Sequence, residues 1–531
     1  MFLSLLYPDE ASAARAARGE GAPRISEAVC ASLGLARMLP LSGGLSGFFT
    51  DDPAVIAYRQ EVFADLLRLP DLCQVLQEAI PVLSDILELR RMDEDMESSG
   101  DSYLYSITEI ELYVSCVDGL QKGLSALSGR VESRAARALC RRIAELSESD
   151  YYRELNAELS ALSSRIREVK SVTIGVNLDA RLRPAEAGVI SVNAQPFKSG
   201  RVLDKILRMS FRNDSFTCIA DLFPYDKNQP ENRRDALQYA FCSALNDVFR
   251  SSVKGWRRIV GEYVLENTDF LLRILPEIEF LSRSAALLRA LSDRGCPLCA
   301  PTLLPIEDKA MHARGLYNPD VALQVSGPMV ENDFDFDENG RIYILTGPNR
   351  GGKSVITCAV GLAQAMAQLG LPCPAREMAL SPVDGIFTHF PDEAETTIDR
   401  GRLGEECLRL REIFAAVTEN SLVLMDESLS STGAYEAAYI AEEVLSAFGA
   451  AQVRAIFSTH LHEVAAALAS INEQSHAHGG VTVDTLVAGM EEGARSFLIR
   501  RKKPDGKSYA RDIADQYGLS FDEMVKLARK E

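Results

Sequence analysis

A glycine-rich stretch carries the clearest chemistry in this sequence. Residues 347–354 read Gly-Pro-Asn-Arg-Gly-Gly-Lys-Ser, which fits the pattern G-x-x-x-x-G-K-[ST]. Glycines let backbone N–H groups converge on phosphate oxygens, and a following helix adds partial positive charge at its N-terminus. Lys353 supplies a point charge for the β- and γ-phosphates, and the Ser354 hydroxyl can ligate Mg²⁺. We therefore expect ATP to be bound by Gly347, Pro348, Asn349, Arg350, Gly351, Gly352, Lys353 and Ser354.

Two carboxylates further along the chain could complete this chemistry. Asp426 and Glu427 end the apolar run Ser421–Met425. An aspartate at the end of a buried strand can hold Mg²⁺ directly or through water, so Asp426 is an expected metal ligand beside Ser354. Glu427 is expected to orient and polarise the attacking water. Buried carboxylates are costly without a partner cation, which favours this functional interpretation over a structural one.

Histidines end two other apolar runs. His460 follows Ala455–Thr459, one predicted strand after the Asp-Glu pair. A lone histidine is usually an ordinary core or surface residue, but this position favours a catalytic role as a sensor of the γ-phosphate. His389 ends the run that starts at Ile386, and a nucleotide-sensing role is weaker there.

Strands and a helix must bring these side chains together. Ile342–Leu345 is too short for a helix and suits a buried strand, and Val355–Leu369 predicts the helix after the loop. A chance glycine turn is disfavoured by this order of strand, loop and helix. With the two later runs as further strands, we expect three strand ends to meet around one nucleotide pocket.

The first 300 residues have a different pattern. Apolar residues recur at helical spacing from Asp52 to about Glu168, and we interpret these stripes as packing faces. The predicted helices begin at Pro53 and then cover residues 76–89, 107–124 and 135–162, with a loop over the acidic residues 93–101. Alternating β-branched residues in Ser171–Leu178 and Val189–Asn193, with Pro184 in the turn, predict a β-hairpin.

Composition narrows the class of protein. The chain of 531 residues is too long for a single core, and its 47% hydrophobic and 25% charged residues are ordinary for a globular protein. A net charge of −19 argues against a surface coated in nucleic-acid-binding charge, but it leaves room for a local basic patch. Residues 254–258, with Trp256 among basic residues, are a candidate patch, although such clusters are more often simply solvated.

The N-terminus, the apolar runs and the cysteines of the sequence bear on where in the cell the protein is located. The N-terminus has no basic region before its apolar start, and no apolar run reaches membrane-spanning length. The 11 cysteines are scattered among apolar helical patterns, which is typical of reduced thiols. Cys296 and Cys299 form a C-x-x-C without a second ligand pair, which disfavours a zinc site. We expect a cytoplasmic protein that is not bound to a membrane.

These motifs resemble the ATPase domain of the MutS family of DNA mismatch repair proteins. The resemblance is carried by Thr346–Ser354, Asp384–Thr388, Ser421–Glu427, Ser458–His460 and Lys507–Ala510 with Gly518-Leu519. The form G-P-N-x-G-G-K-S is more specific than a general phosphate-binding loop. The match runs from about Tyr317 to Glu531, and the helices from Asp52 onward are similar to the family's lever and core helices. By position, Val330 lies where family members contact the adenine base.

The resemblance implies a fold and a function. It implies an α/β P-loop ATPase domain of ABC type over residues 301–531, after a mostly α-helical lever and core domain over 51–300. The β-hairpin would be an insertion at about 170–200, and residues 1–50 a leader. ATP and Mg²⁺ are the implied cofactors, and the implied partners are a second copy of the chain and duplex, mismatched or branched DNA. ATP hydrolysis would drive lever movement on DNA during repair.

Departures from the family pattern leave an alternative open. No Phe-x-Glu mismatch reader occurs in the first 200 residues, the chain ends at Glu531 without an Smr nuclease, and residues 399–406 lack the serine and phenylalanine of the trans-acting signature. Arg400 and Arg402 are candidates for that trans-acting role on charge alone.

The alternative is a MutS-like ATPase without mismatch reading, which would act as an ATP switch on branched or recombination DNA or on a protein partner. A chromosome-maintenance ATPase would need LSGG between the P-loop and Asp426, and here LSGG precedes the loop.

Overall fold

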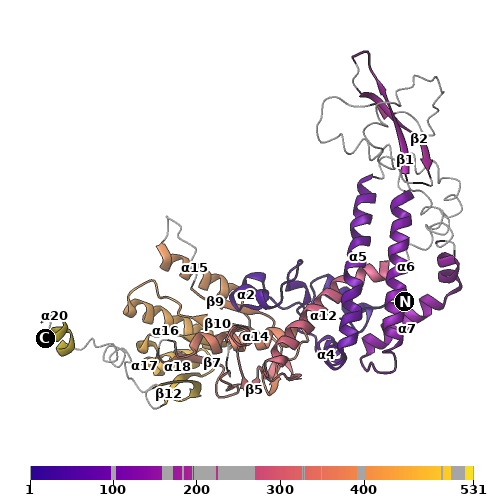
Figure 1. The fold of residues 1–531 in the computed structure, drawn as a ribbon. Helices are drawn as coiled ribbons and strands as arrows, with labels where there is room; N and C mark the ends of the chain where they lie inside the picture. The colour runs from indigo at the N-terminus through magenta and orange to yellow at the C-terminus, as the bar shows by residue number, and fades with distance from the viewer. Residues whose placement is uncertain are drawn as a thin grey trace. The chain divides into compact units, whose positions relative to one another are not determined.

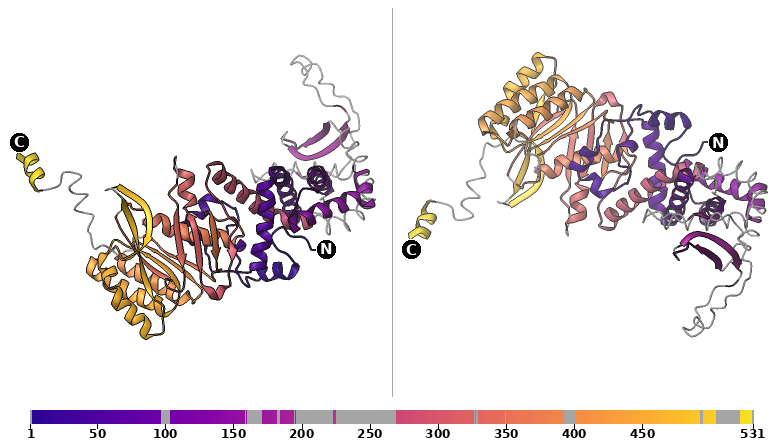
Figure 2. Two further views of the ribbon diagram at one scale, coloured as in Figure 1. Left: turned by 90° about the horizontal axis from the view of Figure 1, so that it is seen from below. Right: turned by 90° about the horizontal axis from the view of Figure 1, so that it is seen from above.

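In the computed structural model, the chain forms two compact units (Figures 1 and 2). It describes residues 2–96, 103–157, 159, 171–181, 184–193, 195, 223–224, 269–325, 327, 329–348, 350–391, 401–491, 494–503 and 521–529. The helical unit comprises Leu69–Glu132 and Ala136–Glu279, and the sheet unit comprises Phe2–Arg68, Ser133–Ala135 and Phe280–Glu531. Residues 2–68 therefore lie in the same compact unit as the C-terminal half of the chain.

Paired helices dominate the helical unit. Helices α5 (Pro70–Met96) and α6 (Tyr103–Ser125) lie side by side (Figure 1). Arg90 of α5 joins Glu109 of α6 and Asp269 of α12 (Asp269–Asp293) through ion pairs of 2.7 and 2.8 Å. Helix α7 (Arg134–Glu148) begins in the sheet unit and continues here.

Two details of the predicted helices are wrong. The acidic stretch was expected to be a loop from residue 93, but α5 continues to Met96. The helix expected over 135–162 is interrupted, because the Ser149 hydroxyl donates to Leu146 O at 2.7 Å and accepts from Tyr152 N at 3.2 Å. Side-chain bonds of this kind offer the backbone an alternative to a continuous helix.

The predicted hairpin is confirmed. Strand β1 (Ser171–Leu178) pairs antiparallel with β2 (Pro184–Asn193), and β3 (Phe223–Pro224) pairs with β2. Pro184 begins the second strand instead of lying in the turn.

A six-stranded sheet forms the centre of the sheet unit. Its order is β13-β12-β7-β11-β10-β9, and all neighbours are parallel except β13 and β12. The strands are β7 (Ile342–Thr346), β9 (Ile386–His389), β10 (Leu422–Asp426), β11 (Arg454–Ser458), β12 (Val483–Glu491) and β13 (Ala494–Arg501). Carboxyl ends of parallel strands meet at one edge, so the ends of β7, β11 and β10 lie together there. The three predicted strands are therefore neighbours in one sheet.

Helices cover both faces of this sheet. Helix α14 (Lys353–Gln368) packs on β10 and β11, while α16 (Ala434–Ala450), α17 (His462–Ala466) and α18 (Leu468–Ala477) pack on β7 and β12. Ile344 and Met425 join the core on the α16 side, whereas Leu424 faces Gly361 of α14. Since successive side chains of a strand point to opposite faces, α14 and α16 lie on opposite sides.

The N-terminal residues complete the sheet unit. Leu33, after α2 (Glu27–Ser32), touches α14 at Gly361, where an added Cβ would lie 2.8 Å from its Cδ2. Arg24 bonds the backbone beside β9, donating to Asp384 O at 2.8 Å and accepting from Ile386 N at 3.1 Å. Helix α14 is therefore buried on nearly all sides.

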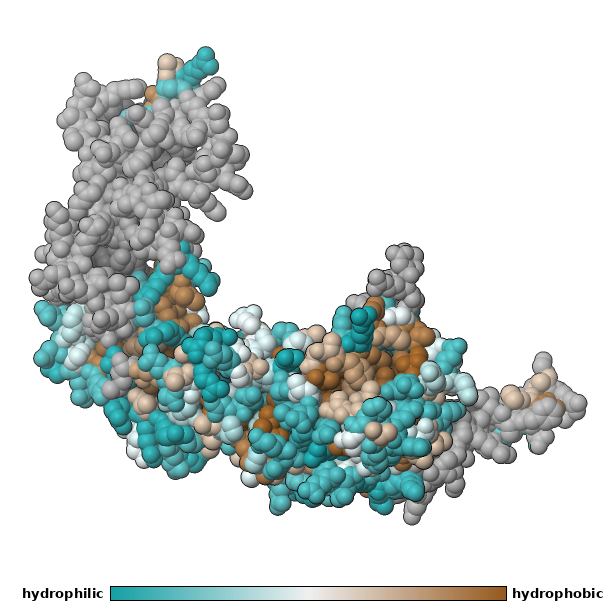
Figure 3. Space-filling model, turned by 180° about the vertical axis from the view of Figure 1, so that it is seen from behind, coloured by the Kyte–Doolittle hydropathy of each residue, from teal (hydrophilic) through white to brown (hydrophobic). Residues whose placement is uncertain are grey.

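The remaining elements frame these two layers. A second sheet has the order β4-β8-β5-β6, with β4 (Thr302–Leu303), β8 (Glu377–Leu380), β5 (Met311–Leu316) and β6 (Asn332–Phe336). The other elements are α1 (Glu10–Ala17), α3 (Leu35–Met38), η1 (Ser46–Phe48), α4 (Pro53–Arg68), η4 (Ile306–Asp308), α13 (Pro319–Gln324), α15 (Gly401–Ala416) and α20 (Phe521–Arg529). Hydrophilic residues cover much of the described surface in Figure 3. Among the described helices, none is long and apolar enough to cross a membrane.

Candidate nucleotide-binding site

The glycine-rich loop connects β7 directly to α14. Gly347 and Gly352 have φ values of 140° and 93°, which only glycine adopts readily. A Cβ at Gly347 would lie 2.7 Å from the Ala488 side chain, and one at Gly351 would lie 2.8 Å from Pro348 O. The loop is thus closed by residues without side chains, as a phosphate-binding turn requires. Asn349 lies outside the described residues.

Lys353 lies beneath this loop. Its side chain is 4% exposed, and Nζ donates to Gly347 O at 3.1 Å and to Pro348 O at 3.3 Å. Burial lowers the pKa of Lys353, while the nearby Glu427 and Asp426 carboxylates act in the opposite direction. The ammonium group is therefore held close to both predicted carboxylates.

Asp426 has the features of a cation ligand. It pairs with Ser458 across β10 and β11. Within the described part of the chain, Asp426 Oδ1 and Ser458 Oγ are buried without a hydrogen-bond partner. A buried carboxylate oxygen without a partner is costly, and oxygen ligands are those that Mg²⁺ prefers. Asp426 and the Ser354 hydroxyl both offer oxygen atoms of the kind that would hold a magnesium ion.

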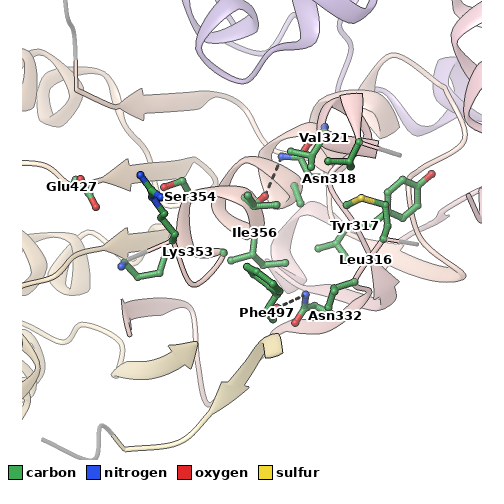
Figure 4. Close-up of a pocket in the computed structure, with 17 residues that line it drawn as sticks. Leu316, Tyr317, Asn318, Val321, Asn332, Lys353, Ser354, Ile356, Glu427 and Phe497 are labelled. Carbon is green, nitrogen blue, oxygen red and sulfur yellow. Dashed lines mark hydrogen bonds between the residues drawn. The ribbon is translucent and has the colours of Figure 1, made fainter. Parts of the chain in front are cut away.

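Glu427 follows Asp426 in an unusual backbone conformation. Its φ is 45°, although it is not glycine, and its N–H donates to Ser458 O at 2.9 Å. Its side chain lines the same cavity as Lys353 and Ser354 (Figure 4). A left-handed backbone at a non-glycine residue costs about 1–3 kcal/mol and persists only where the surroundings enforce it.

The cavity has a charged end and an apolar end. Its volume is about 450 Å³, within the usual range for small-molecule sites. Figure 4 shows Glu427, Lys353 and Ser354 on one side and Leu316 and Tyr317 on the other. The full apolar lining is Leu316, Tyr317, Val321, Val325, Met329, Val330, Val355, Ile356, Ala359 and Phe497. This shape suits a ligand with phosphates at one end and a flat, weakly polar group at the other.

Val330 lies in this apolar lining, where the adenine contact is expected, and its role stays a prediction. Phe497 was missed by the sequence analysis. Its φ is 57°, its carbonyl accepts from Asn332 Nδ2 at 3.3 Å, and its ring lies 3.5 Å from where a Gly352 Cβ would be. A backbone bulge on β13 directs Phe497 over the glycine-rich loop. Such a bulge follows no sequence motif, so the residue could not be identified from the sequence.

His460 lies apart from the cavity. It follows the end of β11 by two residues, its side chain is exposed, and it is not among the residues that line the cavity. Its neighbour Thr459 is buried, and the Thr459 N–H donates to Leu345 O at 3.0 Å. The structure thus places His460 at the expected sheet edge without a contact to the cavity, and its sensor role stays a prediction.

Of the other basic residues predicted to have a role, some lie among the described residues and some do not. Arg350 lines the cavity, and Arg402 lies in α15. Arg400, the basic cluster around Trp256 and the Lys507–Ala510 segment lie outside the described residues.

Comparison with known proteins covers both units. The family model for MutS domain V matches residues 343–529, and the model for the MutS2 N-terminal domain matches residues 51–308. A DNA mismatch repair protein MutS of Listeria welshimeri is 29% identical over 264 residues, 49% of this chain and 29% of that protein. DNA mismatch repair protein MutS 1 of Haloarcula marismortui is 30% identical over 194 residues, 36% of this chain and 21% of that protein.

The aligned region is thus less than a third of the length of these relatives. At the family level these relatives make this chain a MutS-type protein with a domain V, which is the family's ATPase domain. The two family models fall on different halves of the chain, and the domain V model includes the glycine-rich loop. The chain belongs to the MutS family.

Proposed function

We propose that this protein hydrolyses ATP and couples the hydrolysis to DNA binding, with DNA repair as its process. One observation carries the proposal: Lys353, Ser354 and Glu427 line the charged end of one cavity, with the unpartnered Asp426 oxygen on the adjoining strand end. The ABC-type assignment of the fold belongs to the same proposal. Its support is the parallel sheet in which β11 separates β7 from β10.

Each residue has a distinct task in this proposal. The glycine-rich loop and the N-terminus of α14 bind the phosphates, and Lys353 exchanges its two loop carbonyls for phosphate oxygens. Asp426 and Ser354 would hold Mg²⁺, which neutralises phosphate charge when bound. Glu427 orients a water molecule and accepts its proton. The apolar end of the cavity, with Val330 and Phe497, holds the base.

Movement and assembly extend the proposal to the whole protein. The MutS2 N-terminal match covers α4 to α12, so we assign these helices the role of levers that respond to ATP. A homodimer would complete each ATP site across its interface, and His460 would sense the γ-phosphate in that assembled state. The matched relatives carry the name DNA mismatch repair protein, which supports DNA as the partner.

Replacement of Glu427 tests the proposal. Glu427→Gln keeps the shape of the side chain but removes the base, so ATP hydrolysis should fall by about a hundredfold or more while ATP still binds. The control is Glu443→Gln on the exposed side of α16, which should hydrolyse ATP normally. Steady-state hydrolysis and nucleotide titration on the full chain measure both effects. Unchanged hydrolysis in Glu427→Gln would refute the assignment.

The second candidate is an ATP switch without mismatch reading. It is favoured by the absence of Phe-x-Glu from the first 200 residues. Binding and ATPase stimulation by homoduplex, mismatched and junction DNA at one fixed salt concentration would separate the two, because salt sets nucleic-acid affinity. A clear preference for mismatched duplex would exclude the second candidate.

A further inference from the structure

The turn that follows β10 is strained at two positions. Glu427 and Leu429 have φ values of 45° and 65°, and neither is glycine. Ser428, between them, is buried. A left-handed backbone is unfavourable at residues other than glycine, so the turn needs partners that enforce its shape. The Glu427 N–H bond to Ser458 O supplies only one of them.

His389 is one such partner. It ends β9 and is 1% exposed, with Nδ1 2.7 Å from Ser428 Oγ and Nε2 3.2 Å from Glu406 O of α15. Burial, with the positive charge of Arg409, lowers the pKa of His389 to about 4, so the ring is neutral near pH 7. Because a carbonyl oxygen only accepts, Nε2 must carry the hydrogen and Nδ1 must accept one.

The Ser428 hydroxyl is the available donor to Nδ1. Its oxygen also lies 2.9 Å from His389 O, so the single hydroxyl hydrogen is shared between two acceptors of the same histidine. The bond between Ser428 and His389 Nδ1 joins the turn after β10 to the end of β9. The other ring nitrogen of His389 connects this pair to α15.

Glu406 is the second partner. Burial raises the pKa of Glu406, and interactions of its carboxylate with the Ser431 hydroxyl and the Leu429 N–H oppose this rise. Within the described residues, Glu406 Oε2 is buried without a hydrogen-bond partner. Glu406 therefore contacts the turn directly, through its side chain, and indirectly, through its carbonyl and His389. Both contacts come from a single residue of α15.

We propose that His389 and Glu406 are positioning residues that lock the turn after β10 and so fix the Glu427 carboxylate for hydrolysis. The inference rests on the proposed function. Because both bonds originate in one turn of α15, a shift of α15 loosens the Glu427 turn and slows hydrolysis.

Two substitutions at His389 separate its two bonds. An asparagine amide reaches roughly the place of Nδ1, so His389→Asn keeps the Ser428 contact. A glutamine amide reaches roughly the place of Nε2, so His389→Gln keeps the Glu406 contact. We expect kcat to fall by about tenfold or more in His389→Gln and by less in His389→Asn, with KM for ATP unchanged, because misplaced catalytic groups lose rate before affinity.

Ser428→Ala provides a second test. It should lower kcat at least as much as His389→Gln does, because it also removes the bond to His389 O, and the double variant should be no slower than Ser428→Ala. His476→Gln, at an exposed histidine whose ring contacts only Thr482 among described partners, is the matched control and should leave kcat unchanged. Additive losses in the double variant, or unchanged kcat in His389→Gln and Ser428→Ala, would overturn the proposal.

Amide hydrogen exchange distinguishes this inference from the proposed function. The Leu429 amide should exchange faster in Glu406→Gln than in the nucleotide-free wild type, whether or not ATP is hydrolysed. If neither the wild type nor Glu427→Gln hydrolyses ATP, the proposed function fails. In that case the rate of amide exchange at Leu429 alone decides whether Glu406 holds the turn after β10. Faster exchange without a change in kcat would overturn the positioning role. Equal ATP affinity and thermal midpoint in the variants show that they are folded.

Discussion

At the scale of single residues, the charged groups of the site either contact the protein's own backbone or have an unsatisfied oxygen. Lys353 donates to two carbonyls of its own loop, and Asp426 Oδ1 is buried without a partner within the described chain. Both arrangements cost free energy that a bound nucleotide and cation would recover.

Asp426→Asn tests this view of the aspartate. Mg²⁺ should tighten ATP binding to the wild type, and about tenfold less so to the variant, because a metal ligand is lost. The thermal midpoint without nucleotide should change little, because Asp426 Oδ1 has no hydrogen bond to lose among the described residues. Nucleotide titrations with and without Mg²⁺, together with thermal unfolding, measure both. Asp308→Asn, at an exposed aspartate, is the control. Equal Mg²⁺ dependence in Asp426→Asn would contradict the assignment.

The buried His389 predicts a pH dependence of stability. Burial lowers its pKa to about 4, and Arg409 adds to the effect. The unfolded chain takes up a proton near pH 6.5 and the folded chain only near 4, so stability falls as the pH drops between these values, by up to ~3 kcal/mol. NMR titration of the six histidines, with His389→Gln to assign the signal, measures the value. A His389 signal that titrates near 6.5 would contradict this burial.

At the scale of elements, local patterns predicted what depends on local sequence. Short apolar runs before the glycine loop and before Asp426 identified β7 and β10, and their end residues located the charged end of the cavity. Phe497 and the contact of His389 with Glu406 depend on strands and helices far apart in the sequence, and no spacing encodes them. The acidic residues 93–96 are the last residues of α5, a helix that pairs with α6.

Two glycines in α6 test how closely α5 and α6 pack. An added Cβ at Gly123 would overlap both methyl groups of Val75 in α5, whereas at Gly119 it would meet no described atom within 4 Å. Gly123→Ala should therefore destabilise the helical unit by about 1–3 kcal/mol through overpacking. Gly119→Ala should stabilise it by about 0.5–1 kcal/mol, because alanine is the better helix former. Urea unfolding followed by circular dichroism measures both, and effects of the same sign would contradict the predicted packing.

At the scale of the whole molecule, the N-terminal residues belong to the sheet unit. Arg59 of α4 is fully buried and donates to Leu6 O at 3.2 Å, to Phe48 O, and to Leu369 O at 3.4 Å, at the end of α14. The Phe48 ring stacks on Phe280 of α12 with centroids 4.6 Å apart. One guanidinium thus joins the N-terminal segment and α4 to the helix that begins at the phosphate-binding loop.

Arg59→Met tests this connection. Methionine fills much of the space but leaves three buried carbonyls without their donor, so the sheet unit should lose about 3 kcal/mol or more of stability. Trypsin should also release the N-terminal segment faster, because residues 2–50 would separate more often from α14. Thermal unfolding and timed proteolysis followed by mass spectrometry measure the two effects. Arg283→Met, which removes the same charge from an exposed position on α12, should change neither. If Arg59→Met behaves like this control, then apolar contacts such as Leu33 on Gly361 hold the N-terminal segment without Arg59.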